Sequence, residues 1–372
     1  MGELDYLIGS DIVNLLCRVI VIITVLINWR SMGNIDSKKG TGFFFAWIVL
    51  TIYSVFYSPI DGDNFTSMDK FLSFETGVDE NVLHFEPIYF LIMGLSPSGY
   101  VGYRFILWGT GMALIVLLTK KLKYNPHIST IFLIGFALLL LNYQRAIIGY
   151  ALLYWSLYFI INAFDGHGFR DKINILISLG LLLLALPFHK TMIIYEIILV
   201  VSLLFPRNKY LFLCVLFVGV IIPSIFPRIS DLILSYTPDE TREKALRYTL
   251  SAGESGTVAK NLFGYISFFV QRGSFFFILG YCLWNIKSND LNFTHLEQVL
   301  LINTFMLYMV SLFYGNQFNA VSGKLFYASL LPFSLFMSSF YTRTDKLRVK
   351  NLFTTLLVIS ILGSATISLM AH

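Results

Sequence analysis

Residues Arg145–Lys190, RAIIGYALLYWSLYFIINAFDGHGFRDKINILISLGLLLLALPFHK, form two long apolar runs with a polar turn between them, Asp165 to Lys172. Each run approaches the about 20 apolar residues that a helix needs to cross a bilayer. A chain that crosses, turns and returns brings its two ends back to one level. The stretch therefore predicts a helical hairpin in a membrane, with Arg145 and His189 at the same depth on the same face.

The composition of the whole chain supports a membrane protein. The 372 residues are 56% hydrophobic and only 13% charged, whereas a soluble domain carries about 25% charged residues. Such a chain could not cover a water-exposed surface with polar groups. No segment resembles a linker, so we expect an all-α polytopic membrane protein with a single domain over residues 1–372.

Apolar runs of spanning length predict about twelve transmembrane helices. The runs cover residues 10–29, 41–60, 99–119, 126–142, 144–162, 173–188, 191–205, 210–226, 261–283, 297–314, 324–341 and 351–370. Asn125 and Pro126 are typical of a helix start, with a capping residue followed by proline at the first helical position.

The basic residues orient the chain, because cytoplasmic loops carry an excess of Lys and Arg. Most of them follow the odd-numbered runs: Arg30, Lys38, Lys39, Lys120, Lys121, Lys123, Arg170, Lys172, Arg207, Lys209, Lys287, Arg343, Lys346, Arg348 and Lys350. We therefore expect those loops in the cytoplasm and both termini outside. The net charge of +5 reflects this asymmetry and does not indicate binding to nucleic acid.

Two longer segments are predicted on the outer side, residues 61–98 and 227–260. The first is acidic and ends in a short apolar stretch, Pro87 to Leu95, which cannot span a membrane and is expected to lie in the interface or to re-enter. The second contains a helix start at Thr237-Pro238-Asp239-Glu240. Residues 238–250 then predict an amphipathic helix on the outer membrane surface.

Charged residues inside apolar runs are functional candidates, because burying a charge in hydrocarbon is costly. The predicted spans contain Arg18, Arg104 and Arg272 but just one acidic residue, Glu196. At least one arginine therefore lacks an acidic partner among the spans. The alternative to a functional role is that these arginines extend to the surface or bind backbone carbonyls.

The predicted outer end of the hairpin combines a histidine with several cations. His189 suits proton transfer near neutral pH, and Arg145 suits a diphosphate because its guanidinium binds two oxygens at once. Arg104, Lys190 and Lys324 are predicted on the same side of the membrane. Such a cluster fits a polyanion at the membrane surface, and a lipid-linked diphosphate is the simplest example.

Three segments resemble the bacterial polysaccharide polymerases of the Wzy and EpsG type, and their order and spacing also fit. They are Glu86-Pro87-Ile88-Tyr89, similar to the family's Glu-Pro-x-Tyr; Tyr143–Gly149, similar to an Arg-led segment that opens a span; and Phe188-His189-Lys190-Thr191, similar to Phe-His-Lys/Arg-Ser/Thr. The chain departs from the family at two places. Phe65 stands near Asp61 and Asp63 where a Tyr is usual, and Lys324 occupies the place of a late Arg.

The resemblance implies a metal-independent, cofactor-free glycosyltransferase with a multi-span architecture of the GT-C type. It would act on undecaprenyl-diphosphate-linked oligosaccharide at the outer face of the bacterial inner membrane and release undecaprenyl diphosphate. Expected partners are this substrate, membrane lipid and a chain-length-regulating membrane protein. The predicted site residues are His189, Glu86 and Asp63 as candidate bases; Arg145, Arg104, Arg272, Lys190 and Lys324 for the diphosphate; and Arg242, Arg247 and Tyr248 of the second external segment for substrate.

Three alternatives remain open from the sequence. One is a GT-C enzyme that adds single sugars from a polyprenyl-phosphate donor, and another is a flippase or transporter without chemistry. The inverted repeat of many transporters is not visible in the sequence, and the polar cluster is predicted on one side. A third alternative concerns the site: Asp61 and Asp63 could bind a divalent cation, although we expect no metal.

Overall fold

The computed structural model describes residues 7–8, 10–31, 41–57, 71, 87–96, 99–125, 127–131, 146–165, 169–189, 192–205, 210, 273, 275–286, 291–314, 319–344 and 348–356. Within these ranges the regular elements are helices, and no strand occurs. The chain divides into two compact units. The first comprises Met1–Val200 with Met337–Thr342, and the second comprises Val201–Phe336 with Arg343–His372.

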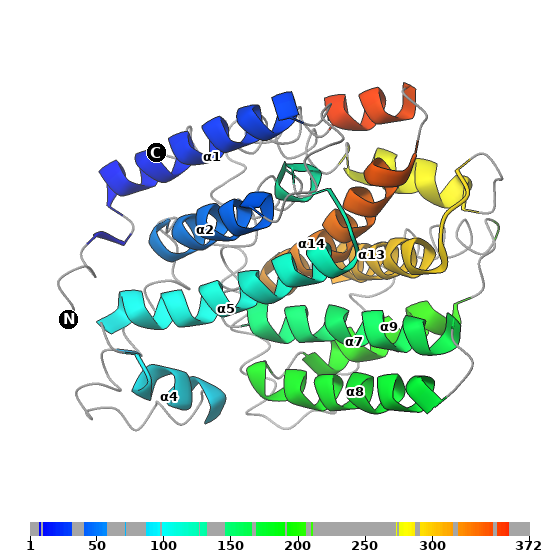
Figure 1. Ribbon diagram of the computed structural model, residues 1–372, viewed down its shortest axis with the longest axis horizontal. Helices are drawn as coiled ribbons and strands as arrows, with labels where there is room; N and C mark the ends of the chain where they lie inside the picture. Colours follow the sequence, from blue (N-terminus) through cyan, green and yellow to red (C-terminus); the bar gives the residue numbers. More distant parts are fainter. Residues whose placement is uncertain are drawn as a thin grey trace. The chain divides into compact units, whose positions relative to one another are not determined.

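The helices of the first unit follow the predicted runs closely (Figure 1). They are α1 (Asp11–Ser31), α2 (Thr41–Phe56), α4 (Pro87–Gly94), α5 (Gly99–Lys121), α7 (Ile147–Asp165), α8 (Phe169–Ala185), the short 3-10 helix η4 (Leu186–Phe188) and α9 (Met192–Leu204). The short apolar stretch that cannot span a membrane is α4. It packs against α5 and η4.

The second unit contains the helix Phe275–Trp284, α13 (His295–Tyr314), most of α14 (Asn319–Arg343) and a short helix at 348–356. These correspond to the predicted runs 261–283, 297–314, 324–341 and 351–370. The predicted run 126–142 is described only at residues 127–131, which are helical. The run 210–226 beyond Tyr210, the external segment 227–260, and residues 61–86 apart from Phe71 lie outside the described residues.

The surface of α1 shows why the fold requires a lipid solvent. Its buried face carries Asn14, Thr24 and Asn28, whereas large apolar side chains such as Leu15 and Leu26 are exposed. The amide of Asn28 donates to the Thr24 carbonyl at 2.7 Å, so the polar groups bond within the protein. A helix with polar groups inside and apolar groups outside is stable only where its surroundings are apolar.

The same inversion occurs on α8, where Leu176 and Leu183 are exposed while Ser178 is buried. Four described helices are long and apolar enough to cross a membrane: Asp11–Arg30, Gly99–Lys121, Ile147–Phe164 and Asp171–Phe188. Shorter apolar helices are Gly42–Phe56, Met192–Leu204 and Phe275–Trp284. The chain is thus an all-α membrane protein, and the number of twelve spans stays a prediction.

Helix α5 is the central element of the first unit, because both α2 and α7 bond to its backbone. The indole nitrogen of Trp47 on α2 donates to the Gly109 carbonyl at 2.9 Å. The indole nitrogen of Trp155 on α7 donates to the Leu114 carbonyl, also at 2.9 Å. A Cβ at Gly111 would lie 2.7 Å from Ile147 Cγ1. Small residues let membrane helices approach this closely.

The predicted hairpin is present as α7 and α8, which run side by side in opposite directions (Figure 1). A hydrogen bond of 2.7 Å joins the hydroxyls of Ser156 and Ser178 across the pair. The α-helix of the second arm ends three residues before the end of the predicted run 173–188, because α8 ends at Ala185 and η4 follows. Pro187 explains this end, since it lacks the backbone N–H that would continue the helix and restricts the residue before it.

The predicted helix start at Asn125 is confirmed. Its Oδ1 accepts hydrogen bonds from the backbone N–H groups of His127 at 2.9 Å and Ile128 at 3.4 Å. The ring Nδ1 of His127 lies 2.7 Å from Oδ1 of Asn28 near the C-terminal end of α1. His127 therefore has a structural role: its ring contacts Asn28 near the C-terminal ends of α1 and α5.

One sequence statement needs correction. Glu196 is not the sole acidic residue of the apolar helices, because Glu297 lies in the first turn of α13 and its side chain is fully buried. Glu297 is the first residue of the predicted run 297–314, so the sequence alone can equally assign it to the loop before that run.

We expect membrane-impermeant maleimide to label Thr257→Cys from outside the cell and to leave Lys121→Cys unlabelled. The physical reason is the bias of basic residues toward loops such as 120–125. Lys121 is exposed at the end of α5, so its silence would report sidedness rather than burial. The test uses a background in which Cys17, Cys214 and Cys282 are replaced by alanine. The reverse labelling pattern would invert the proposed orientation.

Candidate functional site

Two segments far apart in the sequence meet through Tyr89 on α4. Its side chain is completely buried, and its hydroxyl donates a short hydrogen bond to the backbone carbonyl of Phe188 in η4. Tyr89 closes the Glu-Pro-x-Tyr segment, and Phe188 opens the Phe-His-Lys segment. The first and third of the three sequence segments therefore lie in contact.

The second segment joins them through Gly149, in the first turn of α7. A Cβ at this position would lie 3.0 Å from Met192 Sδ, 3.2 Å from Phe188 Cβ and 3.3 Å from the Ala185 carbonyl oxygen. Such distances leave little room for any side chain, so the absence of one at Gly149 lets α7 approach η4 and α9. We call this meeting of α4, the first turn of α7, η4 and the start of α9 the motif end of the first unit.

His189 belongs to the motif end, where it joins η4 to the segment that leads into α9. It is half-buried and follows η4 with an extended backbone, φ −168° and ψ 137°. Its carbonyl accepts a hydrogen bond of 2.8 Å from the Met192 N–H at the start of α9. The imidazole is thus carried on an extended residue between η4, which the Tyr89 hydroxyl holds, and the first N–H of α9, which bonds to the His189 carbonyl.

Arg145 precedes the first residue of α7 by two positions, and its own placement lies outside the described residues. Because α7 and α8 form an antiparallel hairpin, the start of α7 and the end of η4 lie at the same end. The contact between Gly149 and Phe188 shows this directly. The predicted common depth of Arg145 and His189 is consistent with this hairpin and stays a prediction.

The start of α7 is offset along α5 from the beginning of that helix. The first residue of α7, Ile147, packs against Gly111, which is twelve residues along α5, or about 18 Å at 1.5 Å per residue. Figure 1 shows α7 starting part-way along α5, with α4 beside the first part of α5. The start of α7 therefore lies beside the middle of α5 and not beside its first turn.

Arg104, predicted as a diphosphate ligand, is completely buried in α5. Its Nη2 donates to the carbonyl oxygens of Ser54 at 2.8 Å and Tyr57 at 2.9 Å. These carbonyls belong to the C-terminal end of α2, where a positive charge is favourable. Arg104 therefore binds backbone carbonyls, which is the alternative to a functional role that the sequence left open. A role for Arg104 in binding substrate stays a prediction.

Aromatic rings surround the two arginines of this region. The guanidinium carbon of Arg104 lies 5.8 Å from the centre of the Tyr100 ring, and that of Arg18 lies 5.8 Å from the Tyr57 ring. Phe71, from the first external segment, packs on Tyr100 with ring centroids 5.7 Å apart. Part of that segment thus packs into the protein.

Most of the other predicted site residues cannot be placed. Those outside the described residues are Asp63, Glu86, Lys190, Arg242, Arg247, Tyr248 and Arg272. Lys324 belongs to α14 in the second unit. Among the described residues, no group of three or more His, Cys, Asp and Glu side chains could hold a metal ion. The pair Asp61 and Asp63 lies outside them, so metal independence stays a prediction.

Sequence reasoning missed two residues of the motif end, Tyr89 and Gly149. Both stand inside the segments that resemble the family, in which the predicted site residues are the charged Glu86 and Arg145. The signal for Gly149 was a glycine in the first turn of an otherwise bulky apolar helix. No sequence signal pairs Tyr89 with Phe188, because they are 99 residues apart.

No curated protein and no solved structure matches the chain. A family model does match, over residues 13–372, which is nearly the entire sequence and includes both units. The match contains all three segments that meet at the motif end. The chain belongs to the EpsG family, the family of EpsG/Wzy-type exopolysaccharide polymerase-like proteins.

Proposed function

We propose that this protein joins undecaprenyl-diphosphate-linked oligosaccharide repeat units into longer chains at the outer face of the bacterial inner membrane. Family membership indicates a polysaccharide polymerase-like glycosyltransferase. The observation that carries the finer proposal is the convergence at the motif end. Tyr89 and Gly149 both contact the segment that bears His189, and Arg145 lies two residues before α7.

The proposed reaction transfers the growing chain from its lipid carrier to a new lipid-linked unit. A hydroxyl at the non-reducing end of the acceptor attacks the anomeric carbon of the donor sugar. The bond from this carbon to the diphosphate oxygen breaks, and undecaprenyl diphosphate leaves with the electron pair. The acceptor proton passes to His189, the first candidate for the base, ahead of Glu86 and Asp63.

Arg145 and Lys190 are proposed to stabilise the departing diphosphate. Negative charge on this group increases as the bond breaks, so fixed cations lower the energy of the transition state more than that of the ground state. This effect is greatest where water is excluded. Arg272, Lys324, Arg242, Arg247 and Tyr248 are proposed as further substrate contacts.

The decisive experiment uses purified protein in nanodiscs with lipid-linked repeat units and no nucleotide sugar or metal. We expect a ladder of longer lipid-linked chains and release of undecaprenyl diphosphate, unchanged by a chelator. Movement of unchanged repeat units across a liposome membrane would replace the proposal with a flippase. Extension that requires an added polyprenyl-phosphate monosaccharide would replace it with a single-sugar transferase.

We expect Tyr89→Phe to lower kcat for chain extension about 5-fold while KM for the lipid-linked unit changes little. The substitution keeps the buried ring but removes the hydroxyl that donates to the Phe188 carbonyl, and a hydrogen bond of this kind contributes about 1 kcal/mol. The matched control is Tyr158→Phe, because the Tyr158 ring packs on Trp155 and Phe159 of the same helix. Equal rates for both variants would show that Tyr89 does not position His189.

A further inference from the structure

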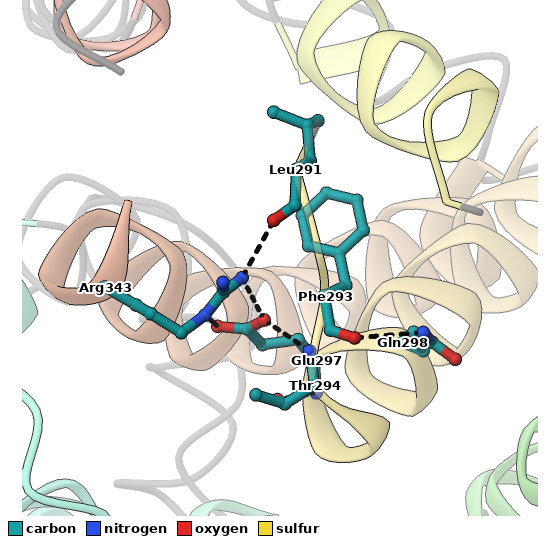
Figure 2. Close-up of polar contacts among 6 residues, drawn as sticks. All are labelled: Leu291, Phe293, Thr294, Glu297, Gln298 and Arg343. Carbon is teal, nitrogen blue, oxygen red and sulfur yellow. Dashed lines mark hydrogen bonds and ion pairs between the residues drawn. The ribbon is translucent and has the colours of Figure 1, made fainter. Parts of the chain in front are cut away.

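In the second unit, a bidentate ion pair joins the start of α13 to the end of α14 (Figure 2). Arg343 Nη2 lies 2.7 Å from Glu297 Oε2, and Arg343 Nε lies 3.1 Å from Glu297 Oε1. The Glu297 side chain is fully buried, whereas that of Arg343 is 33% exposed. Neither residue belongs to the proposed catalytic site.

The same carboxylate also closes the first turn of α13. Its Oε2 accepts the Thr294 N–H at 2.8 Å, and the Glu297 N–H donates to Thr294 Oγ1 at 3.2 Å, which is a capping box. Arg343 Nη2 additionally donates to the Leu291 carbonyl at 3.2 Å. One carboxylate and one guanidinium thus tie together the turn at 291–294, α13 and α14, as Figure 2 shows.

Among the described residues, α14 also makes contacts between aromatic rings in this unit. Phe326 packs on Tyr308 with centroids 5.9 Å apart, Phe333 on Phe275 at 4.6 Å, and Phe336 on Phe293 at 5.6 Å. Ring contacts have weak directional preferences. They therefore hold the helices together but oppose the sliding or rotation of one helix against another less strongly. The bidentate pair has a fixed geometry, and it therefore sets the axial position and rotation of α14.

Fixing α14 matters because Pro332 lies inside the helix. Proline removes a backbone hydrogen bond and bends a helix at that point. From Arg343 back to Lys324 is nineteen residues, or about 28 Å of helix, close to the about 30 Å of the hydrocarbon core. A small slide or rotation at the Arg343 end would therefore change where the Lys324 end stands at the opposite membrane surface.

We propose that Glu297 and Arg343 are positioning residues: from the cytoplasmic side, they set the height and rotation of α14, and with them the place of position 324 relative to the lipid-linked substrate outside. This inference rests on the proposed function, in which Lys324 contacts the diphosphate. Arg343 belongs to the basic segment predicted in the cytoplasm, so the residues that hold the helix and the residues that meet substrate lie on opposite sides.

The test combines two measurements on Glu297→Gln and Arg343→Lys. Glu297→Gln removes the carboxylate charge at nearly constant shape, and Arg343→Lys keeps the charge but loses the two-pronged geometry. Arg348→Gln is the matched control, because Arg348 is exposed in the same basic segment and its loss tests the effect of charge alone. The first measurement is the rate at which Lys324→Cys is labelled from outside by an impermeant maleimide. The second is KM and kcat for extension by protein that retains Lys324.

We expect both variants to change the labelling rate at position 324 and to raise KM for the lipid-linked unit several-fold, with kcat less affected and Arg348→Gln unchanged. Variants that merely melt at a lower temperature, with wild-type labelling and KM, would overturn the proposal. A wild-type protein that extends no chains would overturn the proposed function. Labelling needs no catalysis, so the labelling rates would still decide whether Glu297 and Arg343 position α14.

Discussion

Arg145→Ala is expected to reduce chain extension about 100-fold or more while the protein still reaches the membrane in normal amount. Removing one group that stabilises developing negative charge costs about that much in enzymes whose sites exclude water. Arg145 precedes the first residue of α7, Ile147, which packs against Gly111 well inside the length of α5. We expect the proposed site to exclude water, and an arginine interacts with a diphosphate more strongly there than in water.

Arg145→Lys separates charge from geometry. Lysine keeps the positive charge but cannot bind two oxygens with one planar group, so we expect a loss nearly as large as with alanine. Arg30→Ala is the matched control, because Arg30 is an exposed arginine in the last turn of α1, on the predicted cytoplasmic side. The length profile of the surface polysaccharide measures the effect in cells, and the ladder assay measures it with purified protein.

Normal chain lengths in Arg145→Ala would remove this residue from the site. Lys190 would then be the leading cation beside His189, and Arg104 would be less suitable because its Nη2 is already engaged with the Ser54 and Tyr57 carbonyls. A protein that fails to reach the membrane would instead indicate a structural role, which the amount of Arg145→Ala protein in membranes measures directly.

The helices of this protein were largely predictable because their causes are local. Apolar runs of spanning length, the Asn125 cap and the polar turn between α7 and α8 are visible in the sequence. Pro187 also explains the early end of α8 and could have been used to shorten the predicted run. The stretch at Pro87 was predicted to be too short to span, and α4 is indeed a short helix of eight residues.

The contacts that build the motif end were not predictable, because each joins residues that only the folded chain brings together. The hydroxyl of Tyr89 meets a carbonyl 99 residues away, and carbonyls carry no side-chain signature. Arg104 was noticed for its charge, yet its partners are again carbonyls. The capping box of Thr294 and Glu297 could be read locally, whereas its partner Arg343 lies 46 residues away.

His189→Ala is expected to reduce chain extension about 100-fold or more, because general base catalysis contributes about 10²–10⁴-fold. His189→Gln should recover little of this loss, since glutamine can hydrogen-bond to a hydroxyl but cannot take its proton. The measurement is kcat with purified protein in nanodiscs. His127→Gln is the control: His127 pairs with Asn28 where α1 and α5 finish, so its replacement is expected to affect stability more than kcat.

A His189→Gln protein that works at nearly the wild-type rate would show that His189 binds or packs and is not the base. Glu86 would then become the leading candidate, because it directly precedes α4, whose Tyr89 contacts the Phe188 carbonyl. This outcome also gives a different prediction for Tyr89→Phe. If α4 carries the base, loss of the hydroxyl bond shifts Glu86 itself, and Tyr89→Phe should lower kcat even when residue 189 is glutamine. If His189 is the base, the two losses should not add, because Tyr89 acts on catalysis only through the segment that holds the imidazole.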